Sequence, residues 1–600
     1  MVSAREVREL LDERPDLEPA LEAVLEPEAP WTFDDVDVDS GKFGELVSRG
    51  LVKEDGNGYR VTDPAAVDQA LDGDVEDSSD ARDFDVDVSL PEFGRLELAG
   101  LAGVLVLVVA LRLVPYPAVF QGDAIVLSSN DPYYYRYWLE QLLTDPETTF
   151  TTLPLRVSAG EPLMLAVLWA VTLALGGTTE VAGTVLVWFP IVSALVTALM
   201  IYATTVVVTD DRRIALASVA MLAVAPAHAF RTSLGFADHH AFDYPWLALT
   251  ALALVVALTT VTDRASLRRP QPWIAAVGIG VGVAGQVLAW EAGPLLVLPV
   301  SLVVLGGTLL DVSNDRSSLF RNAPVLAGVG LGAILAGSVH AVAGWQTALV
   351  ASTPALLTLG SVVVIATAEA ARRVGGTARQ LVAVDIGLGV VGLLVFRFGF
   401  TEQWGTFSNR LDTLFRSDGI AETYGLFSAD AFGFLFLLGL TLFLALPAMV
   451  WGVSLARSDR SGWLVAGSYA WVLLALAVIQ VRFVGELAPF LALFAGLAFV
   501  WAASWVDVAR PVLTTSNSDL RDALVPDSRA LVSLFVLFLL FGALGMVQVP
   551  VKTSQVLVDD GAYDAATAIE ADAATQDLEH PDNYVLSRWG QNRMYNYFVS

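Results

Sequence analysis

The chain has 600 residues, of which 55% are hydrophobic and 16% charged, and its formal net charge is −29. Soluble globular proteins carry about 25% charged residues, so this composition excludes an ordinary soluble protein. The acidic charge also excludes a general nucleic-acid-binding protein, which needs a basic surface. Because the chain has no cysteine, disulfides and thiolate metal sites are excluded as well.

Residues 1–66 predict a small soluble α+β domain. Apolar residues at helical spacing predict a helix over Ala4–Leu25, and Ser40–Leu51 has the pattern of a second helix. Leu51–Val61 predicts a hairpin around a Gly-rich turn, which makes the domain winged-helix-like. Its acidic charge disfavours DNA reading, while regulation, partner docking and a structural cap stay open. Residues 67–94 predict an acidic linker, because Asp, Ser and Gly bury too little apolar surface to order the chain.

Residues 95–550 predict an all-α polytopic membrane domain. Apolar stretches of about 20 residues are long enough to span a bilayer as helices. Thirteen spans are expected, at 97–115, 180–207, 214–230, 241–261, 272–290, 293–310, 323–344, 347–370, 381–398, 431–456, 462–481, 486–506 and 529–549. Pro162–Gly176 is left out, because about fifteen residues are too few to cross comfortably, and is predicted to be re-entrant or interfacial.

Basic residues predict the orientation, because they favour cytoplasmic loops. With Pro162–Gly176 left out, every arginine cluster falls on one side of the membrane. These clusters are Arg212/Arg213, Arg264/Arg268/Arg269, Arg316/Arg321, Arg372/Arg373/Arg379, Arg457/Arg460 and Arg510/Arg521. We therefore expect a multi-pass plasma-membrane protein with a cytoplasmic N-terminus. Loops 116–160 and 399–430 are expected outside, as are residues 551–600, the start of an extracytoplasmic C-terminal domain.

The first outer loop contains Ser129-Asn130-Asp131-Pro132-Tyr133-Tyr134-Tyr135-Arg136. A carboxylate at Asp131 followed by three aromatic rings is suited to hold a cation or a sugar. An interfacial aromatic belt is an equally good explanation of the tyrosines, because tyrosine concentrates where membrane meets water.

Asp238-His239-His240 opens a predicted span from the outer side. A carboxylate oxygen and an imidazole two residues apart suit Mn²⁺ or Mg²⁺. The alternative is an ordinary helix start with Asp238 as the N-cap. A function is favoured, because ionisable residues at membrane depth are functional by default.

Two further residues stand out in the outer segments. Glu422 ends Gly419-Ile420-Ala421-Glu422 in a long predicted loop, and such loops are usually functional or disordered; Glu422 alone is an ordinary loop acid. Arg482 departs from the positive-inside pattern, and its planar fork of donors fits a phosphate. Snorkelling to lipid headgroups or pairing with Glu486 explains Arg482 equally well.

In this order, the motifs resemble those of oligosaccharyltransferase catalytic subunits of the archaeal, haloarchaeal type, over residues 97–600. Asn130-Asp131-Pro132-Tyr133-Tyr134 is similar to the first acidic motif of that family, and Asp238-His239-His240 to its second, in the archaeal Asp-x-His form. Ile420-Ala421-Glu422 is similar to its fifth-loop motif, and Arg482 to the outer arginine of its eleventh helix. The resemblance implies a GT-C glycosyltransferase fold of thirteen transmembrane helices.

The C-terminal segment departs from the family. Asn583–Phe598 combines aromatic side chains with Asn and Arg, which suits peptide or sugar recognition, or an ordinary strand–turn. The family's Trp-Trp-Asp-Tyr-Gly signature binds the Ser or Thr of the acceptor sequon. Here those five positions read Arg588-Trp589-Gly590-Gln591-Asn592. A family member continues into a globular domain beyond this point, so that domain is expected to be missing or truncated.

The resemblance implies transfer of a glycan from a dolichol phosphate or pyrophosphate lipid to an acceptor Asn outside the cell, with inversion. Asp131 and Glu422 would hold the acceptor amide, and Arg482 would bind the lipid phosphate. The implied ligands of Mn²⁺ or Mg²⁺ are Asp131, Asp238, His240 and Glu422. Two alternatives stay open: a glycosyltransferase acting on a non-peptide acceptor, which the lost signature favours, and a non-catalytic paralogue or transporter. Membrane lipid is an expected partner and nucleic acid is not.

Overall fold

The structure is a computed structural model of the chain. It describes residues 7, 10–11, 14–25, 30–55, 58–62, 64–71, 94–417, 419–428, 433–458, 460–506, 508–509, 511–513 and 528–599. The chain divides into two compact units, Met1–Leu90 and Pro91–Ser600. The predicted turn at 56–57, most of the predicted linker (72–93), and Arg510 and Arg521 lie outside the described residues.

The N-terminal unit contains short helices and one hairpin. Its main elements are a 3-10 helix (Pro15–Leu17), α2 (Glu18–Leu25), α3 (Ser40–Ser48), β1 (Val52–Asp55), β2 (Gly58–Val61) and α4 (Pro64–Leu71). The helix predicted over Ala4–Leu25 is interrupted at Pro15, because proline has no N–H to continue the helical bonding. β1 and β2 pair antiparallel, with Val52 opposite Val61.

α4 crosses the domain boundary predicted at residue 66. Val67 and Ala70 are buried in the same apolar cluster as Leu21 and Leu46, so this helix packs with the N-terminal unit. The order of elements, two helices, a hairpin and a third helix, is compatible with a winged helix, and that assignment stays a prediction.

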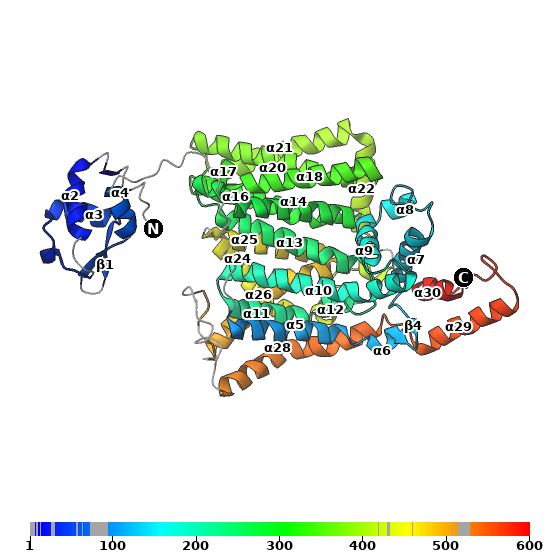
Figure 1. Cartoon of the computed structure of the whole chain (residues 1–600). Coiled ribbons are helices and arrows are strands. Elements are labelled where there is room, and N and C mark those ends of the chain that lie inside the picture. The colour runs from blue at the N-terminus through cyan, green and yellow to red at the C-terminus, as the bar shows by residue number, and fades with distance from the viewer. Residues whose placement is uncertain are drawn as a thin grey trace. The chain divides into compact units, whose positions relative to one another are not determined.

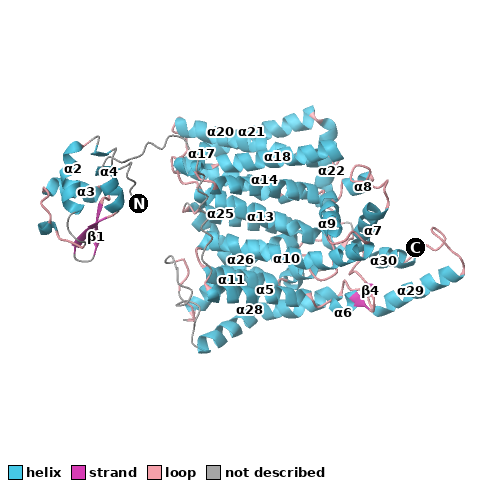
Figure 2. Cartoon of the chain, viewed as in Figure 1, coloured by secondary structure: helices cyan, strands magenta, loops and turns pink. Residues whose placement is uncertain are grey.

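Long, nearly parallel helices make up the second unit (Figure 1, Figure 2). Each predicted span corresponds to one helix or to a pair of consecutive helices. These are α5 (Arg95–Arg112), α10 (Thr179–Thr209), α11 (Arg212–Ala223) with α12 (Pro226–Arg231), α13 (His239–Thr260), α14 (Gln271–Ala289), α15 (Gly293–Leu296) with α16 (Leu298–Ser313), α18 (Ala323–Ala343), α19 (Ala348–Ala351) with α20 (Thr353–Arg373), α21 (Ala378–Gly399), α23 (Gly433–Leu438) with α24 (Thr441–Arg457), α25 (Ser461–Ile479), α26 (Val484–Trp505) and α28 (Ser528–Ser554).

Within the described ranges, ten helical segments are long and apolar enough to cross a membrane. The predicted all-α, polytopic membrane fold is therefore confirmed, while the number of thirteen spans stays a prediction. The span predicted at 214–230 is not one helix: it breaks between α11 and α12. Pro226 begins α12, and its missing N–H explains why the helical bonding stops there.

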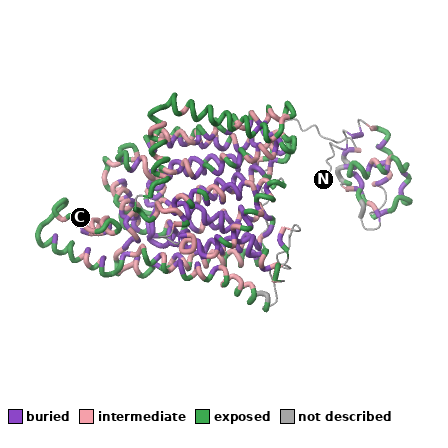
Figure 3. Tube along the Cα trace, turned by 180° about the vertical axis from the view of Figure 1, so that it is seen from behind, coloured by how far each residue is buried: buried purple, intermediate pink, exposed green. Residues whose placement is uncertain are grey.

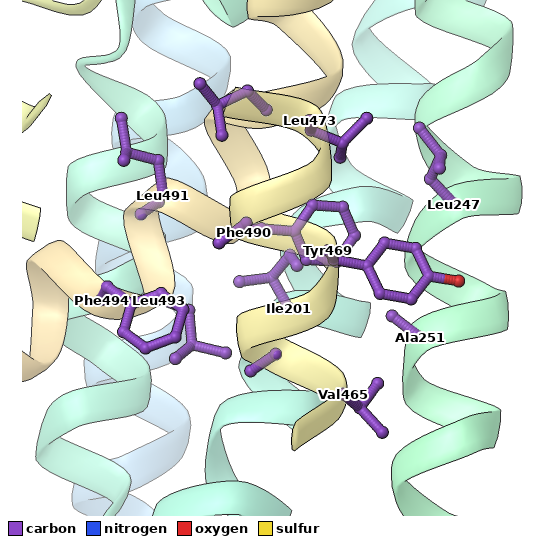
Figure 4. Close-up of a cluster of buried hydrophobic side chains, with 14 of the residues drawn as sticks. Ile201, Leu247, Ala251, Val465, Tyr469, Leu473, Phe490, Leu491, Leu493 and Phe494 are labelled. Atoms are coloured by element: carbon purple, nitrogen blue, oxygen red, sulfur yellow. The ribbon is translucent and has the colours of Figure 1, made fainter. Parts of the chain in front are cut away.

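Apolar side chains are exposed on the surface of this unit and closely packed in its interior, as expected for a membrane protein. α21 is apolar in sequence, yet nearly all its side chains are exposed (Figure 3). Soluble proteins rarely expose apolar patches of this extent, so we assign this face to lipid contact. The inner helices are packed instead, as where Tyr469 of α25 stacks on Phe490 of α26 with ring centroids 4.6 Å apart (Figure 4).

Shorter elements gather at one end of the bundle, on the right in Figure 1. They are α6 (Tyr116–Val119), β3 (Phe120–Gln121), β4 (Ala124–Ile125), α7 (Asp131–Thr144), α8 (Leu155–Ser158), α9 (Pro162–Ala174), α22 (Thr401–Leu414), α29 (Asp560–Thr575) and α30 (Trp589–Val599). The segments predicted as outer loops, 116–160 and 399–430, are thus partly helical. α9 coincides with the short segment Pro162–Gly176 and packs against α7, α10 and α14.

Candidate functional site

The N-terminal end of α13 carries the predicted Asp-x-His motif. Asp238 caps this helix, because its Oδ1 accepts a hydrogen bond from the backbone N–H of His240 at 3.0 Å. The same oxygen lies 3.0 Å from Nδ1 of His239. The N-cap alternative is therefore correct as local structure, but it does not exclude a ligand role, because both contacts use Oδ1 and leave Oδ2.

His240 faces Glu486, near the start of α26. Its Nδ1 lies 2.6 Å from Glu486 Oε1, and both side chains are buried. An ionised carboxylate only accepts, so His240 donates from Nδ1 and, when neutral, keeps its lone pair on Nε2. Asp243 follows one turn later on α13, and its carboxylate lies in one cluster with His240 and Glu486, with ligand atoms within 4.8 Å of one another. Neither oxygen of Asp243 has a hydrogen-bond partner among the described residues.

Arg231, the last residue of α12, joins Glu422 to this buried cluster. Its Nη2 donates to Glu422 Oε1 at 3.2 Å, and its Nη1 lies 3.8 Å from Glu486 Oε2. Nη1 also donates to the carbonyl oxygen of Arg482. Nη2 of Arg482 lies 3.9 Å from Glu422 Oε2. Glu422, in the 3-10 helix Ala421–Thr423, is thus bracketed by two arginines.

Asp131, the first residue of α7, contacts the C-terminal helix α30. Nη1 of Arg593 donates to Asp131 Oδ1 at 2.5 Å, although the two residues are 462 positions apart. The backbone N–H of Arg593 donates to Asn130 Oδ1 at 3.0 Å. The rings of Tyr133 and Tyr597 add an aromatic contact between the two helices, with centroids 5.5 Å apart.

The three predicted carboxylates influence one another electrostatically. Partial burial, followed by the negative charge of Asp238, raises the pKa of Asp131, and the charge of Arg593 opposes this rise. Glu422 also contributes to the rise. Burial is the largest influence on the pKa of Glu422 and would raise it, but the charges of Arg231, His240 and Arg482 together keep that pKa below its ordinary value. The structure therefore brings Asp131, Asp238 and Glu422 into one neighbourhood, at the end of the bundle where the short elements gather.

A family model described as oligosaccharyl transferase STT3, N-terminal, matches residues 105–417, just over half of the chain. The chain belongs to this family. A search of curated proteins by sequence finds no match.

Solved structures of an archaeal oligosaccharyltransferase are similar to this chain. AglB from Archaeoglobus fulgidus in complex with an inhibitory peptide and a dolichol-phosphate has a TM-score of 0.66 and 17% identity, over 84% of this chain and 60% of that chain. The A. fulgidus enzyme tethered to an acceptor peptide with the NVT sequon gives 0.62 and 17%, over 84% and 63%. Its complex with Zn and sulfate gives 0.59 and 16%, over 84% and 57%. This chain spans about three fifths of these relatives, and the likeness shows a shared fold.

The donor set of this STT3-family chain fits a divalent cation. Ligand atoms of Asp238, His239 and His240 lie within 4.8 Å of one another. Carboxylate oxygens and imidazole nitrogens are donors that first-row divalent metals accept, and oxygen-rich sets suit Mg²⁺ and Mn²⁺. Asp131 and Glu422 would supply further oxygens, although each is paired with an arginine in this structure.

The five positions predicted to correspond to the family signature, of which four differ from it, lie at or just before the start of α30. Trp589 and Gly590 are exposed, and Arg588 donates to the Gln591 side chain at 3.1 Å. Asn592 donates to the Val585 carbonyl at 3.1 Å and accepts from Tyr584 at 3.0 Å. The following residue, Arg593, is the one that contacts Asp131.

Sequence reasoning missed four residues of this neighbourhood. Arg231 follows directly on the predicted span 214–230, and an arginine on the outer side is the same signal that singled out Arg482. The sequence predicts Glu486 only as a possible ion-pair partner of Arg482. In the structure its carboxylate faces His240 and Arg231. Asp243 lies in the predicted span 241–261 and Arg593 in the segment Asn583–Phe598, but no spacing rule shows that their side chains turn toward the site.

Proposed function

We propose that the chain transfers a glycan from a dolichol phosphate or pyrophosphate lipid to the side-chain amide of an acceptor Asn. The observation that carries this proposal is a set of contacts around the Asp-x-His motif. Tyr135, one turn after Asp131 on α7, lies 3.4 Å from His239, and Arg231 joins Glu422 to Glu486, the partner of His240. Family membership supports it. The similar archaeal enzyme was captured with a dolichol-phosphate and with an acceptor peptide containing an NVT sequon.

An amide nitrogen is a weak nucleophile, so the site must orient it and withdraw its lone pair from resonance with the carbonyl. Asp131 and Glu422 accept the two amide N–H groups in the proposed complex. Both carboxylates already accept from planar N–H donors, Arg593 and Arg231 respectively. In this proposal the acceptor amide replaces Arg593 at Asp131, while Arg231 keeps Glu422 in place.

Asp131, Asp238, His240 and Glu422 would hold Mn²⁺ or Mg²⁺. When bound, the cation supplies Lewis-acid stabilisation of the charge that develops on the leaving phosphate oxygen. Glu486 fixes the ring of His240 through its Nδ1, so that Nε2 points away as the ligand nitrogen. The similar archaeal enzyme has been crystallised with Zn and sulfate, which supports a divalent metal as a ligand of this fold.

Arg482 neutralises the lipid phosphate in the proposed complex. Its guanidinium is one-third exposed, lies 5.9 Å from the Trp290 ring centroid and lies near Glu422. A planar guanidinium offers two parallel donors to a phosphate. Attack of the acceptor nitrogen on the anomeric carbon, opposite the departing phosphate, inverts that carbon. The segment 399–430 would close over both substrates and open for release.

This reaction would take place on the extracytoplasmic face of the plasma membrane. The arginine clusters predict a cytoplasmic N-terminus, and Asp238, Glu422 and Arg482 belong to segments predicted on the outer side. Residues 551–600 would then lie outside, where α30 meets α7.

One observation favours a second candidate, a glycosyltransferase with a non-peptide acceptor. Of the five positions predicted to carry the signature, only Trp589 agrees with the family, and Arg588, Gly590, Gln591 and Asn592 differ from it. The test is to give the purified chain and lipid-linked glycan either an Asn-x-Thr peptide or a lipid-linked glycan acceptor, and to identify products by mass spectrometry. A glycopeptide that disappears when Asn is replaced by Gln supports the proposal, whereas extension of the lipid glycan alone supports the second candidate.

A further inference from the structure

A cavity lies at the opposite end of the bundle from Asp238. It has a volume of about 960 Å³ and is lined by the ends of several spans, including the C-terminal end of α13 at Leu258 and Thr259. Asp238 caps the other end of that helix, and 22 residues at 1.5 Å each separate the two by about 33 Å. The cavity is therefore distinct from the candidate active site. Its size is at the upper end of the usual range for small-molecule sites, about 300–1,000 Å³.

The cavity is basic in a strongly acidic protein. Four arginines and two aspartates line it: Arg264, Arg316, Arg321, Arg460, Asp210 and Asp263. The lining thus carries an excess of positive charge, whereas the whole chain has a net charge of −29. These arginines come from three different connections between spanning helices, and the fold brings them together around this cavity.

Arg321 is the anchored member of the group. Its Nη1 lies 2.8 Å from the buried Asp311, and its Nη2 donates to Ser461 at 2.7 Å. Arg264 lies over the ring of Phe320, 5.2 Å from its centroid. Arg264 and Arg460 are exposed, so they can turn toward an anion without leaving a buried carboxylate behind.

The remaining walls are apolar. They include Val207, Val208, Leu258, Val261 and Trp463. Val207, on the spanning helix α10, is 42% exposed, so this apolar wall is accessible to a ligand. A ligand that fits has a charged head beside the arginines and an apolar body along these walls.

We propose that this cavity binds the headgroup of an anionic phospholipid from the cytoplasmic leaflet. Basic pockets between membrane helices on the cytoplasmic side are suited to such headgroups, because anionic lipids are attracted to Lys and Arg near the membrane surface. The positive-inside rule explains why arginines occur in these loops. It does not explain a large cavity with four of them in its lining and an apolar wall beside them.

The test uses the full chain in a neutral detergent and native mass spectrometry. Phosphatidylglycerol, phosphatidylcholine and inorganic pyrophosphate are titrated separately at matched ionic strength. Binding of phosphatidylglycerol is expected at least tenfold tighter than that of phosphatidylcholine. Arg264→Gln combined with Arg460→Gln is expected to weaken phosphatidylglycerol binding about thirtyfold, because two of the four cavity arginines lose their charge.

Arg268→Gln combined with Arg457→Gln is the matched control, because each arginine is exposed within four residues of a substituted one and neither lines the cavity. This control should bind phosphatidylglycerol within twofold of the unmodified chain. Thr259→Trp keeps every charge and fills the cavity, so it should also weaken the lipid. The proposal is overturned if the cavity and control variants lose binding equally, or if the two lipids bind equally well. It is also overturned if pyrophosphate binds as tightly as phosphatidylglycerol and loses its binding in the same cavity variant.

Discussion

Glu486 Oε1 lies 2.6 Å from Nδ1 of His240, and both side chains are buried between α13 and α26. A carboxylate behind a histidine fixes its tautomer and its ring orientation, and raises its basicity as a metal ligand. The pair therefore ties the Asp-x-His motif to the helix that begins just after Arg482.

Glu486→Gln should weaken divalent-cation binding by about tenfold to a hundredfold, which is the usual effect of losing such a partner. Glutamine keeps the size of the side chain but no longer provides a charged acceptor for Nδ1. The measurement is a Mn²⁺ titration of the purified chain, with free Mn²⁺ followed by electron paramagnetic resonance.

Asp311→Asn provides the control for that titration. Asp311 is also buried and ion-paired, with Arg321 at 2.8 Å, but it lies by the cavity at the other end of the bundle. It should leave the Mn²⁺ affinity unchanged. If Glu486→Gln binds Mn²⁺ as tightly as the unmodified chain does, Glu486 has no role in orienting His240.

Gly485→Ala should destabilise the chain by about 1–3 kcal/mol, the usual cost of overpacking a filled site. A Cβ at this position would meet the hydroxyl of Tyr244 and would lie 3.1 Å from Arg231 Nη1. Arg231 also holds Glu422, so the same variant should lose transfer activity. Thermal unfolding in detergent and an activity assay measure the two effects.

Gly467→Ala is the matched substitution, in the neighbouring helix α25. A Cβ there meets nothing within 4 Å, and alanine in a helix interior is favoured over glycine by about 0.5–1 kcal/mol. Its Tm should be unchanged or higher. A Gly485→Ala protein as stable as the Gly467→Ala protein would show that Arg231 and Tyr244 are not packed against α26 as described.

Arg593→Ala should loosen α30 from α7. The Arg593–Asp131 pair is 30–40% exposed, so it is worth about 1 kcal/mol, or about fivefold in the local opening equilibrium. Hydrogen exchange of residues 589–599 should accelerate by that factor. Arg588→Ala, which removes only a local bond to Gln591, should leave the exchange unchanged, and equal acceleration in both variants would contradict the contact with Asp131.

Much of the fold was predictable from apolar length alone. A run of about 20 apolar residues has one stable solution in a bilayer, so each predicted span has its helix. The breaks within spans were not predicted, because an apolar stretch of about 20 residues is judged as a whole. The stretch 214–230 passes this criterion although Pro226 ends the helical bonding after α11. The helix α22 was not predicted either. It lies in the predicted outer loop 399–430, and its apolar residues are too few for a spanning segment.

The candidate site was only partly predictable. Asp131, Asp238, Glu422 and Arg482 stood out as charges in segments expected outside the membrane. Glu486 and Asp243 lie inside apolar helices, where sequence gives the charge but not the direction of the side chain. Arg593 depends on a contact across 462 residues, and the folding of α30 onto α7 is needed to reveal it.

In the proposed reaction, Asp131 and Glu422 act on one acceptor amide in one site. The direct test is the single-turnover rate of glycan transfer to an Asn-x-Thr peptide for Asp131→Asn, Glu422→Gln and the double variant. Each single substitution should lower the rate at least 100-fold, as loss of a preorganised polar group does. Residues that act as a unit are not additive, so the double variant should be no slower than the slower single variant. Full activity in Asp131→Asn, or losses that multiply in the double variant, would contradict the shared site.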